Sequence, residues 1–307
     1  MAAQRISSLA LSRTQPMRKL FEIENVSCSY DKQYTPGVSR IVLDIRHLVL
    51  PAGKTVFVVG ESGIGKSTVL EVLGIMNNTI VPSRDSVFRF YEDEGKAVDI
   101  LKLWRENNDA ALSGFRRKHF NFIFQSTNLM KNFTAYENIS IVRMLQGYSR
   151  EESFERASGV LHELGLDHVG QDRMSQELSG GQQQRLAFAR AVIPDFTVLF
   201  GDEPTGNLDG DNAVKAMSLL SDKLKHTGGS SAIIVSHDMH LAVSFADIIV
   251  RIRKEFCNIS DHGDESEFKG VIDDDCIFTP DSDRQVWTGN SRSFSLDEFE
   301  QFLKQRQ

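Results

Sequence analysis

A short apolar run that ends in a glycine-rich turn is the feature that most constrains the fold of this chain. Val56–Val59 predicts a buried strand, the sequence Gly-Glu-Ser-Gly-Ile-Gly-Lys-Ser follows at residues 60–67, and Ser67–Met76 predicts a helix with one apolar face. Glycines let the backbone curl so that its N–H groups point at phosphate oxygens, and the helix adds its positive N-terminal end. A glycine-rich turn can arise by chance, but the strand before it and the helix after it favour a nucleotide-phosphate site.

The residue types of this loop predict its contacts with a nucleotide. Lys66 is expected to reach the β- and γ-phosphates, and the Ser67 hydroxyl is expected to ligate Mg²⁺. The loop by itself does not separate kinases, GTPases and transport ATPases. The residues that we predict to bind the nucleotide here are Gly60, Ser62, Gly63, Gly65, Lys66, Ser67 and Thr68.

Two carboxylates follow a second apolar strand, which we predict over Thr197–Phe200. Asp202 stands where a strand end would hold Mg²⁺ through water, opposite Ser67. Glu203, one residue further on, is placed to act as the general base that activates water for attack on the γ-phosphate. Two acids after a strand more often begin a solvated loop, but the phosphate-binding loop upstream in the same alternating pattern favours the catalytic interpretation.

A third motif, Leu-Ser-Gly-Gly-Gln at residues 178–182, precedes a predicted helix over Gly181–Val192. The phosphate-binding loop, this motif and the Asp202-Glu203 pair occur in the order of the ATP-binding-cassette (ABC) ATPase family. The chain resembles that family over about residues 20–250, and the intact third motif is the family's most specific mark. The resemblance implies Mg-ATP as the bound nucleotide and ATP hydrolysis as the reaction.

The resemblance also assigns roles to a glutamine and a histidine. Gln125, at the end of a strand predicted over Phe120–Phe124, resembles the glutamine that touches Mg²⁺ and the partner-facing surface. His237, after a strand predicted over Ala232–Val235, resembles the histidine that positions the γ-phosphate and the attacking water. Simpler interpretations stay open, because Gln125 could merely end a strand and His237 could be structural.

Two further residues match positions of the family outside its main motifs. Asp209 resembles the aspartate that helps to shape the dimer interface, and Tyr30 resembles the aromatic residue placed against adenine. An aromatic residue in a strand is more often part of the core, and Tyr34 is nearby. Tyr30 is therefore the least constrained of the predicted site residues.

The resemblance implies an active site that is shared between two chains. In the family, the serine and the glycine N–H groups of the third motif begin a helix and face the γ-phosphate bound to the other subunit. Two copies would pack head to tail around two ATP molecules, close on binding and open after hydrolysis. The residues assigned to this half of the site are Ser179, Gly180, Gly181 and Gln182.

A narrower resemblance lies between Gln125 and the third motif. The pairs Phe124-Gln125, Asn128-Leu129, Phe133-Thr134 and Glu137-Asn138, together with residues 204–209, are similar to the branch of lipoprotein-release, macrolide-export and cell-division ATPases. Members of this branch pair with membrane proteins. The chain departs from the family in three places, which are Gly201 in place of the usual alanine, a longer segment 77–118, and a tail after residue 252.

The expected fold class is α/β, since apolar strands alternate with helices as in a parallel sheet. The resemblance specifies a P-loop NTPase with a RecA-like parallel-sheet core, an antiparallel β subdomain and a helical signature subdomain at about 126–193. We expect a flexible arm over 1–19, the cassette over 20–252, and an acidic extension over 253–307 that ends in a capping-box pattern at 295–298. Residues 77–118 look polar and irregular, apart from a short strand at Val87–Tyr91.

Composition narrows the class of partner. The net charge of −7 argues against nucleic acid, because phosphate binding needs a basic face. No apolar run reaches the roughly 18 residues of a membrane span, and the three cysteines, Cys28, Cys257 and Cys276, lie far apart in sequence. The scattered cysteines favour the reducing cytoplasm, and the branch resemblance implies a protein that is peripheral on the inner face of the cell membrane.

The most favoured function is the ATP-hydrolysing subunit of a membrane complex whose separate, permease-like subunit crosses the bilayer. A soluble ABC ATPase that acts in protein or cofactor assembly is the alternative, and a non-catalytic ATP switch is less favoured because Glu203 is present. Export, extraction from the membrane and force transmission are not distinguished. Truncation after about residue 252 is expected to leave ATP binding intact.

Overall fold

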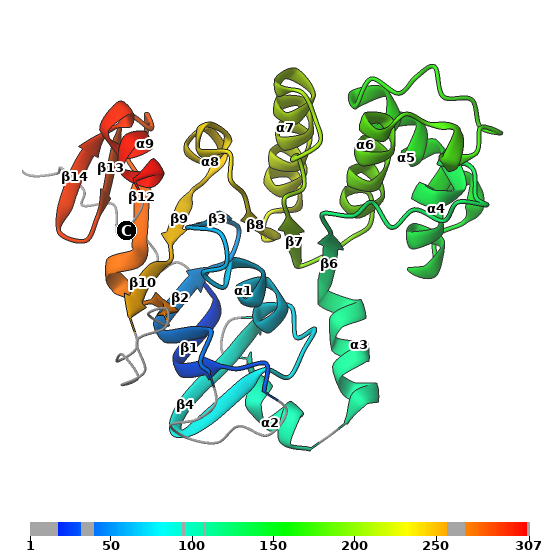
Figure 1. Cartoon of the computed structure of the whole chain (residues 1–307). Helices are drawn as coiled ribbons and strands as arrows, with labels where there is room; N and C mark the ends of the chain where they lie inside the picture. Colours follow the sequence, from blue (N-terminus) through cyan, green and yellow to red (C-terminus); the bar gives the residue numbers. More distant parts are fainter. Residues whose placement is uncertain (1–17, 32–39, 94–95, 107, 257–267, 306–307) are drawn as a thin grey trace, which may run out of the picture.

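In the computed structural model the chain is built around two sheets, with a group of helices beside them (Figure 1). The structure describes residues 18–31, 40–93, 96–106, 108–256 and 268–305. Tyr34, Cys257 and the predicted arm up to residue 17 lie outside the described residues. Lys19, which the sequence assigned to the arm, instead begins the first strand, β1 (Lys19–Cys28).

The larger sheet contains the predicted parallel core, and its strand order is β14-β13-β12-β9-β3-β8-β7-β6. Its five parallel strands read as short apolar runs because helices or the second sheet cover both of their faces. These strands are β3 (Thr55–Val59), β6 (Phe120–Ile123), β7 (Val198–Asp202), β8 (Ser231–Val235) and β9 (Ile248–Arg251). The antiparallel remainder is β12 (Ile277–Pro280), β13 (Val286–Gly289) and β14 (Arg292–Ser295).

The second sheet has the strand order β10-β11-β2-β1-β4-β5, and all of its pairs are antiparallel except β11 with β2. Its members besides β1 are β2 (Leu43–Pro51), β4 (Ile80–Asp93), β5 (Lys96–Asp99), β10 (Arg253–Phe256) and β11 (Phe268–Ile272). The antiparallel β unit expected from the family resemblance is therefore present, and two of its strands come from the C-terminal extension.

The short strand predicted at Val87–Tyr91 is part of a longer strand, but the prediction of irregular structure for the rest of 77–118 was wrong. The segment forms β4, β5 and two helices, α2 (Ile100–Arg105) and α3 (Asp109–His119). The mostly polar stretch 82–86 interrupts the apolar alternation expected of a strand. It lies where the register of β4 against β1 shifts, between Glu24 and Val26. Pairing with β1 stabilises β4 as a strand, and no local pattern reports such a long-range partner. Strand β6 also ends two residues before Gln125, which lies in the following loop.

The helices fall into two groups. The predicted helical subdomain holds α4 (Ala135–Leu145), α5 (Arg150–Glu163), the short η1 (Ser175–Glu177) and α6 (Gly180–Val192), drawn in green in Figure 1. The others accompany the sheets. Besides α2 and α3, they are α1 (Lys66–Leu73), α7 (Gly210–Thr227), α8 (Met239–Phe245), η2 (Asp274–Cys276) and α9 (Leu296–Lys304). Within the described part of the chain, none of these helices combines the length and apolar character needed to span a bilayer.

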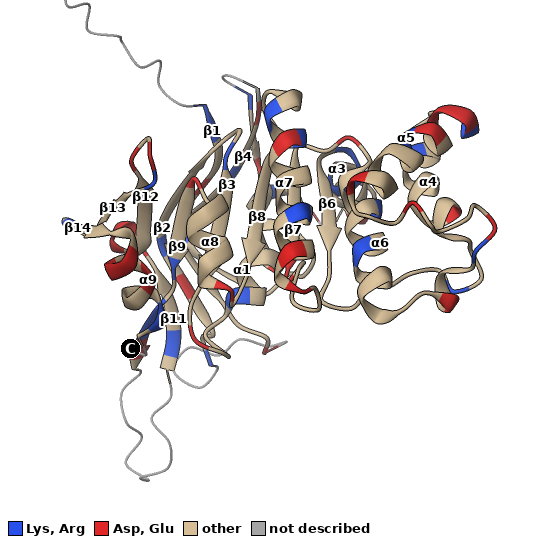
Figure 2. Cartoon of the chain, turned by 90° about the horizontal axis from the view of Figure 1, so that it is seen from above, with Lys and Arg blue, Asp and Glu red and all other residues tan. Residues whose placement is uncertain are grey.

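Two apolar cores lie on opposite faces of the parallel strands. In β3, Val56 and Val58 join the core between the two sheets, while Phe57 and Val59 join the core under the helices. This period of two is the one expected of a strand that is buried on both faces. Acidic and basic residues both occur along the outer helices α5 and α7, as the red and blue segments of Figure 2 show.

The C-terminal extension contributes strands to both sheets. Strands β10 and β11 extend the antiparallel sheet, and β12 pairs with β9 at the edge of the parallel strands. Trp287 and Phe299 are completely buried in the core under the helices, with ring centroids 4.8 Å apart. The predicted capping box is present, since Ser295 and Glu298 bond each other's backbone at the start of α9.

Candidate active site

The phosphate-binding loop leaves the buried strand β3 and enters α1. Gly63 and Gly65 have φ values of 76° and 100°, which residues with a side chain rarely adopt. Gly65 is the N-cap of α1, so the curled loop delivers Lys66 and Ser67 to the first turn of a helix. The N-terminal end of that helix favours bound anions at this point.

Lys66 is buried at the base of the loop, with 7% of its surface exposed. Its Nζ donates to the backbone carbonyl oxygens of Gly60, at 3.0 Å, and Glu61, at 2.7 Å. Burial lowers the pKa of Lys66, and the nearby carboxylates of Glu203 and Asp202 oppose that shift. The result is a cation held inside the loop and turned toward the acidic strand end.

Oxygen donors suited to Mg²⁺ meet at the ends of two parallel strands and the start of α1. The Ser67 hydroxyl donates to Asp202 Oδ2 at 3.1 Å, and Gln125 lines the same cavity from the loop after β6. Hydroxyl, carboxylate and amide oxygens are the ligands that Mg²⁺ prefers in proteins. The residues predicted to ligate the metal therefore fit it.

Glu203 follows β7 with a backbone φ of 49°, a conformation that is unusual for a residue with a side chain. Its Oε2 accepts from the backbone N–H of His237 at 3.3 Å. The His237 Nε2 lies 3.3 Å from Oε1, within ion-pair distance, yet Oε1 accepts no hydrogen bond within the described residues. Burial raises the pKa of Glu203, although His237 opposes the shift. A half-buried carboxylate with a free lone pair suits a general base.

One cavity of about 900 Å³ joins these groups, a volume sufficient for a nucleotide. Ten of the predicted site residues line it: Ser62, Gly63, Gly65, Lys66, Ser67, Thr68, Gln125, Asp202, Glu203 and His237. The cavity is also lined by residues that were not predicted from the sequence, among them Val42, Thr205 and Ser236. Thr205 and Ser236 each lie within two residues of a predicted catalytic residue, and that proximity is the signal that could have found them.

Tyr30 and Asp209 lie at the margin of this cavity and do not line it. The Tyr30 ring is half exposed, and its hydroxyl hydrogen-bonds Thr68 Oγ1 at 3.0 Å and donates to Glu71 Oε2 at 2.7 Å. These bonds fix the ring beside the first turns of α1. Asp209 caps α7 by accepting from the N–H of Asn212, between Leu208 and Gly210, which do line the cavity.

The third motif lies on the helical subdomain, and none of its residues lines the cavity. Ser179 caps α6 in a reciprocal box, since its hydroxyl accepts from the Gln182 N–H and Gln182 Oε1 accepts from the Ser179 N–H. Gly180 and Gly181 form the first turn of α6, and a Cβ built on either would touch nothing within 4 Å. The chain therefore presents a second candidate anion site that faces open space.

Comparison with known proteins gives a family for this arrangement. The ABC transporter family profile matches residues 43–206, which contain the phosphate-binding loop, the third motif and the acidic strand end. This chain belongs to the ABC transporter family. The Gly60–Ser67 loop and residues 178–182, called the signature from here on, both lie inside the matched range.

Two groups of curated relatives resemble this ABC cassette. The macrolide export ATP-binding/permease protein MacB 1 of Yersinia pestis bv. Antiqua (strain Antiqua) is 35% identical over 254 residues, which cover 82% of this chain and 35% of that protein. The lipoprotein-releasing system ATP-binding protein LolD of Chromohalobacter salexigens is 36% identical over 211 residues, covering 69% of this chain and 82% of the relative. The chain thus spans about a third of the macrolide exporter and most of the lipoprotein-release protein.

Solved ABC cassettes share the fold. The dimeric structure of MJ0796, a bacterial ABC transporter cassette, superimposes with a TM-score of 0.62 at 29% identity, covering 76% of this chain and 94% of that one. A dimeric post-hydrolysis state of the same cassette, bound to ADP and Pi, gives a TM-score of 0.60. Dimeric cassettes of this family thus share the fold of the chain described here.

Proposed function

We propose that this ABC cassette works as a head-to-tail dimer and drives a separate integral membrane subunit by binding and hydrolysing Mg-ATP. The observation that carries the proposal is the division of the site within one chain. The loop, acidic strand end and His237 line one cavity, while the signature at the start of α6 lies outside it and faces open space. A second copy could bring its signature to the first copy's γ-phosphate.

Each side chain has a physical role in this proposal. Lys66 and the loop N–H groups bind the β- and γ-phosphates, and Glu203 takes a proton from the attacking water while His237 orients that water. Ser67, Asp202 and Gln125 would hold Mg²⁺, which neutralises phosphate charge when bound. Ser179 and the first turn of α6 stabilise the γ-phosphate across the interface. Tyr30 stacks on adenine and Asp209 shapes the dimer contact.

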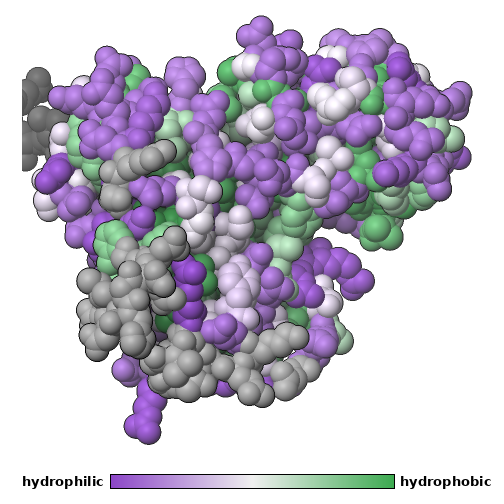
Figure 3. Space-filling view, viewed as in Figure 1, coloured by the Kyte–Doolittle hydropathy of each residue, from purple (hydrophilic) through white to green (hydrophobic). Residues whose placement is uncertain are grey.

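Two observations support a membrane partner: the names of the relatives and the hydrophobic surface of the helical subdomain. The relatives' names describe macrolide export and lipoprotein release, and these do not favour a soluble assembly ATPase. Hydrophobic residues reach the surface of the helical subdomain in Figure 3, and α4 ends with the exposed side chains Met144 and Leu145. A cassette with such a surface would sit at the cytoplasmic face of the membrane, docked on its permease-like subunit. Pull-down from detergent-solubilised cells should recover an integral membrane protein, and recovery of soluble proteins alone would contradict this role.

The shared site predicts a specific effect of Ser179→Asp. Aspartate is as good an N-cap as serine, so α6 should stay folded, but the added negative charge would face the partner's γ-phosphate. We expect ATP turnover to fall by about 100-fold and the ATP-dependent dimer to be lost, as judged by light scattering, while one chain still binds ATP.

The control is Ser149→Asp, since Ser149 caps α5 of the same subdomain in a capping box. Its box partner is the carboxylate of Glu152 and not a glutamine, so this change should lower Tm more than Ser179→Asp does. That change should leave turnover and dimer formation near those of the parent. Parent-like turnover in Ser179→Asp would show that the signature does not complete the site.

A further inference from the structure

The phosphate-binding loop rests against residues that follow β9. The backbone N–H of Ile252 donates to Val59 O at 2.9 Å, and a Cβ built on Gly60 would lie 3.5 Å from Ile252 Cβ. Lys254 Nζ lies 3.6 Å from Glu61 Oε2. The loop is thus contacted from behind at its first two residues by a segment outside the family-matched range 43–206.

The closest contact of this kind is made by Gly270 in β11. Its N–H donates to Val42 O at 2.9 Å, and the same oxygen lies 3.5 Å from a Cβ built on Gly65. A Cβ on Gly270 would lie 2.1 Å from the carbonyl oxygen of Ile64 and 2.9 Å from Ile252 Cγ2. A side chain at this position would collide with these atoms, so glycine is needed for space. Backbone conformation is not the reason, since the φ of Gly270 lies outside the left-handed region.

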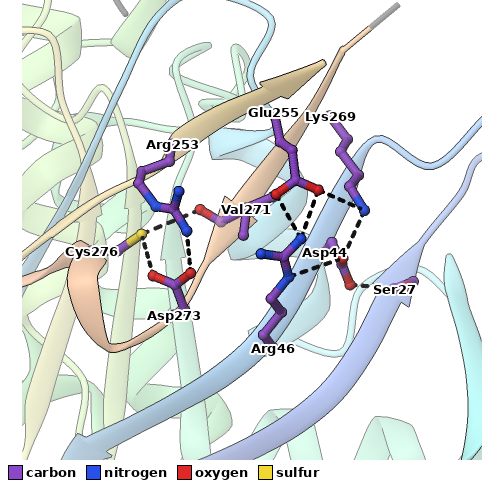
Figure 4. A network of polar contacts seen from close by, with 9 residues as sticks. All are labelled: Ser27, Asp44, Arg46, Arg253, Glu255, Lys269, Val271, Asp273 and Cys276. Carbon is purple, nitrogen blue, oxygen red and sulfur yellow. Dashed lines mark hydrogen bonds and ion pairs between the residues drawn. The ribbon is translucent and has the colours of Figure 1, made fainter. Parts of the chain in front are cut away.

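Strand β11 is fixed in this place by main-chain and charged contacts. It runs parallel to β2, with Gly270 opposite Leu43. Figure 4 shows the ion pairs beside it, in which Lys269 binds Asp44 at 2.9 Å and Arg46 binds Glu255 at 2.7 Å. These charges join β2 to both strands of the β10–β11 pair. The backbone at Gly270 is therefore set by the antiparallel sheet as a whole.

We propose that Gly270 is a positioning residue for ATP binding. The β11 backbone fixes the position of the Ile64 carbonyl. Ile64 connects Gly63 and Gly65, the two glycines of the loop whose φ values lie in the left-handed region. A shift of Ile64 would turn the loop N–H groups and the Lys66 ammonium away from the phosphates. The inference rests on the proposed role of the loop in holding ATP. It makes part of the C-terminal extension a determinant of nucleotide affinity.

The test compares two glycines of the extension that are equally crowded. In Gly270→Ala we expect the KM and Kd for ATP to rise at least about tenfold, with a smaller effect on kcat, because a loop displaced by a fraction of an ångström loses phosphate contacts. In Gly289→Ala the new Cβ would meet Ile277 O at 2.3 Å, within β12 and β13 and away from the loop. That control should lower Tm while keeping KM within twofold. An unchanged KM in Gly270→Ala, or an equal rise in both variants, would overturn the inference.

A second pair serves if Gly270→Ala does not fold. Ile252→Ala and Ile248→Ala remove the same atoms from the same core. Ile248 begins β9 and pairs with Val56, whereas Ile252 directly follows β9 and contacts the loop at Gly60. The inference predicts a raised KM in the first alone, and an equal KM in both refutes it. Lys66→Ala serves as the reference for lost binding. If the parent chain and Lys66→Ala bound ATP alike, the proposed function would fail, and not this inference.

Discussion

Glu203→Gln should lower kcat for ATP hydrolysis by at least about 100-fold and leave ATP binding unchanged, because an amide cannot accept the proton of the attacking water. The side chain keeps its size and its contact with the His237 N–H, so Lys66 and the loop should still hold the nucleotide. Because hydrolysis is what opens the dimer in the proposed cycle, the variant should accumulate as an ATP-bound pair in light scattering. Turnover equal to that of the parent would show that Glu203 is not the general base.

The same substitution makes a prediction about stability that separates catalysis from misfolding. Burial raises the pKa of Glu203 in the folded chain, so its ionised form is less stable there than in the unfolded chain. At pH 7, above the unfolded pKa, that ionised group opposes folding, and a neutral amide relieves the effect. The Tm of Glu203→Gln should therefore equal or exceed that of the parent. A clear fall in Tm would mean that lost turnover reports a damaged fold.

Truncation after Ile252 should abolish folding and, with it, ATP binding, which reverses the expectation from sequence. The deletion removes Phe278, Trp287, Phe299 and Leu303 from the core under the helices. Each buried side chain of this size contributes about 1.5–3 kcal/mol, so together they approach the total stability of a domain, about 5–15 kcal/mol. The deletion also uncovers the edges of β9 and β2. Circular dichroism melts and ATP titration measure the result.

Two neighbouring residues provide the graded version of this experiment. Trp287→Ala should lower the free energy of unfolding by about 3–5 kcal/mol, whereas Val286→Ala, at an exposed position of the same strand, should change it by less than about 1 kcal/mol. A truncated chain that melts like the parent and binds ATP would show that the extension is dispensable for the cassette.

The chemistry of the site could be predicted from sequence because each group belongs to a short contiguous motif. The loop at residues 60–67, the pair Asp202-Glu203 and the signature at 178–182 are each local in the chain, and their residue types are dictated by phosphate and metal ligation. The structure brings the first two into one cavity and keeps the third apart from it. Gln125 and His237 needed the family resemblance, since single residues after strands carry no motif of their own.

What the sequence by itself determined was therefore the local chemistry, the alternating α/β core and the ABC family to which the chain belongs. Only the tertiary structure decided that 80–93 is a long strand, that the extension completes both sheets, and that Gly270 abuts the Ile64 carbonyl. The physical reason is the range of the interactions. Glycine turns, helix caps and apolar periodicity act between neighbours in the chain, whereas strand pairing and van der Waals exclusion join residues about 200 positions apart, such as Ile64 and Gly270, and leave no periodic trace in the sequence.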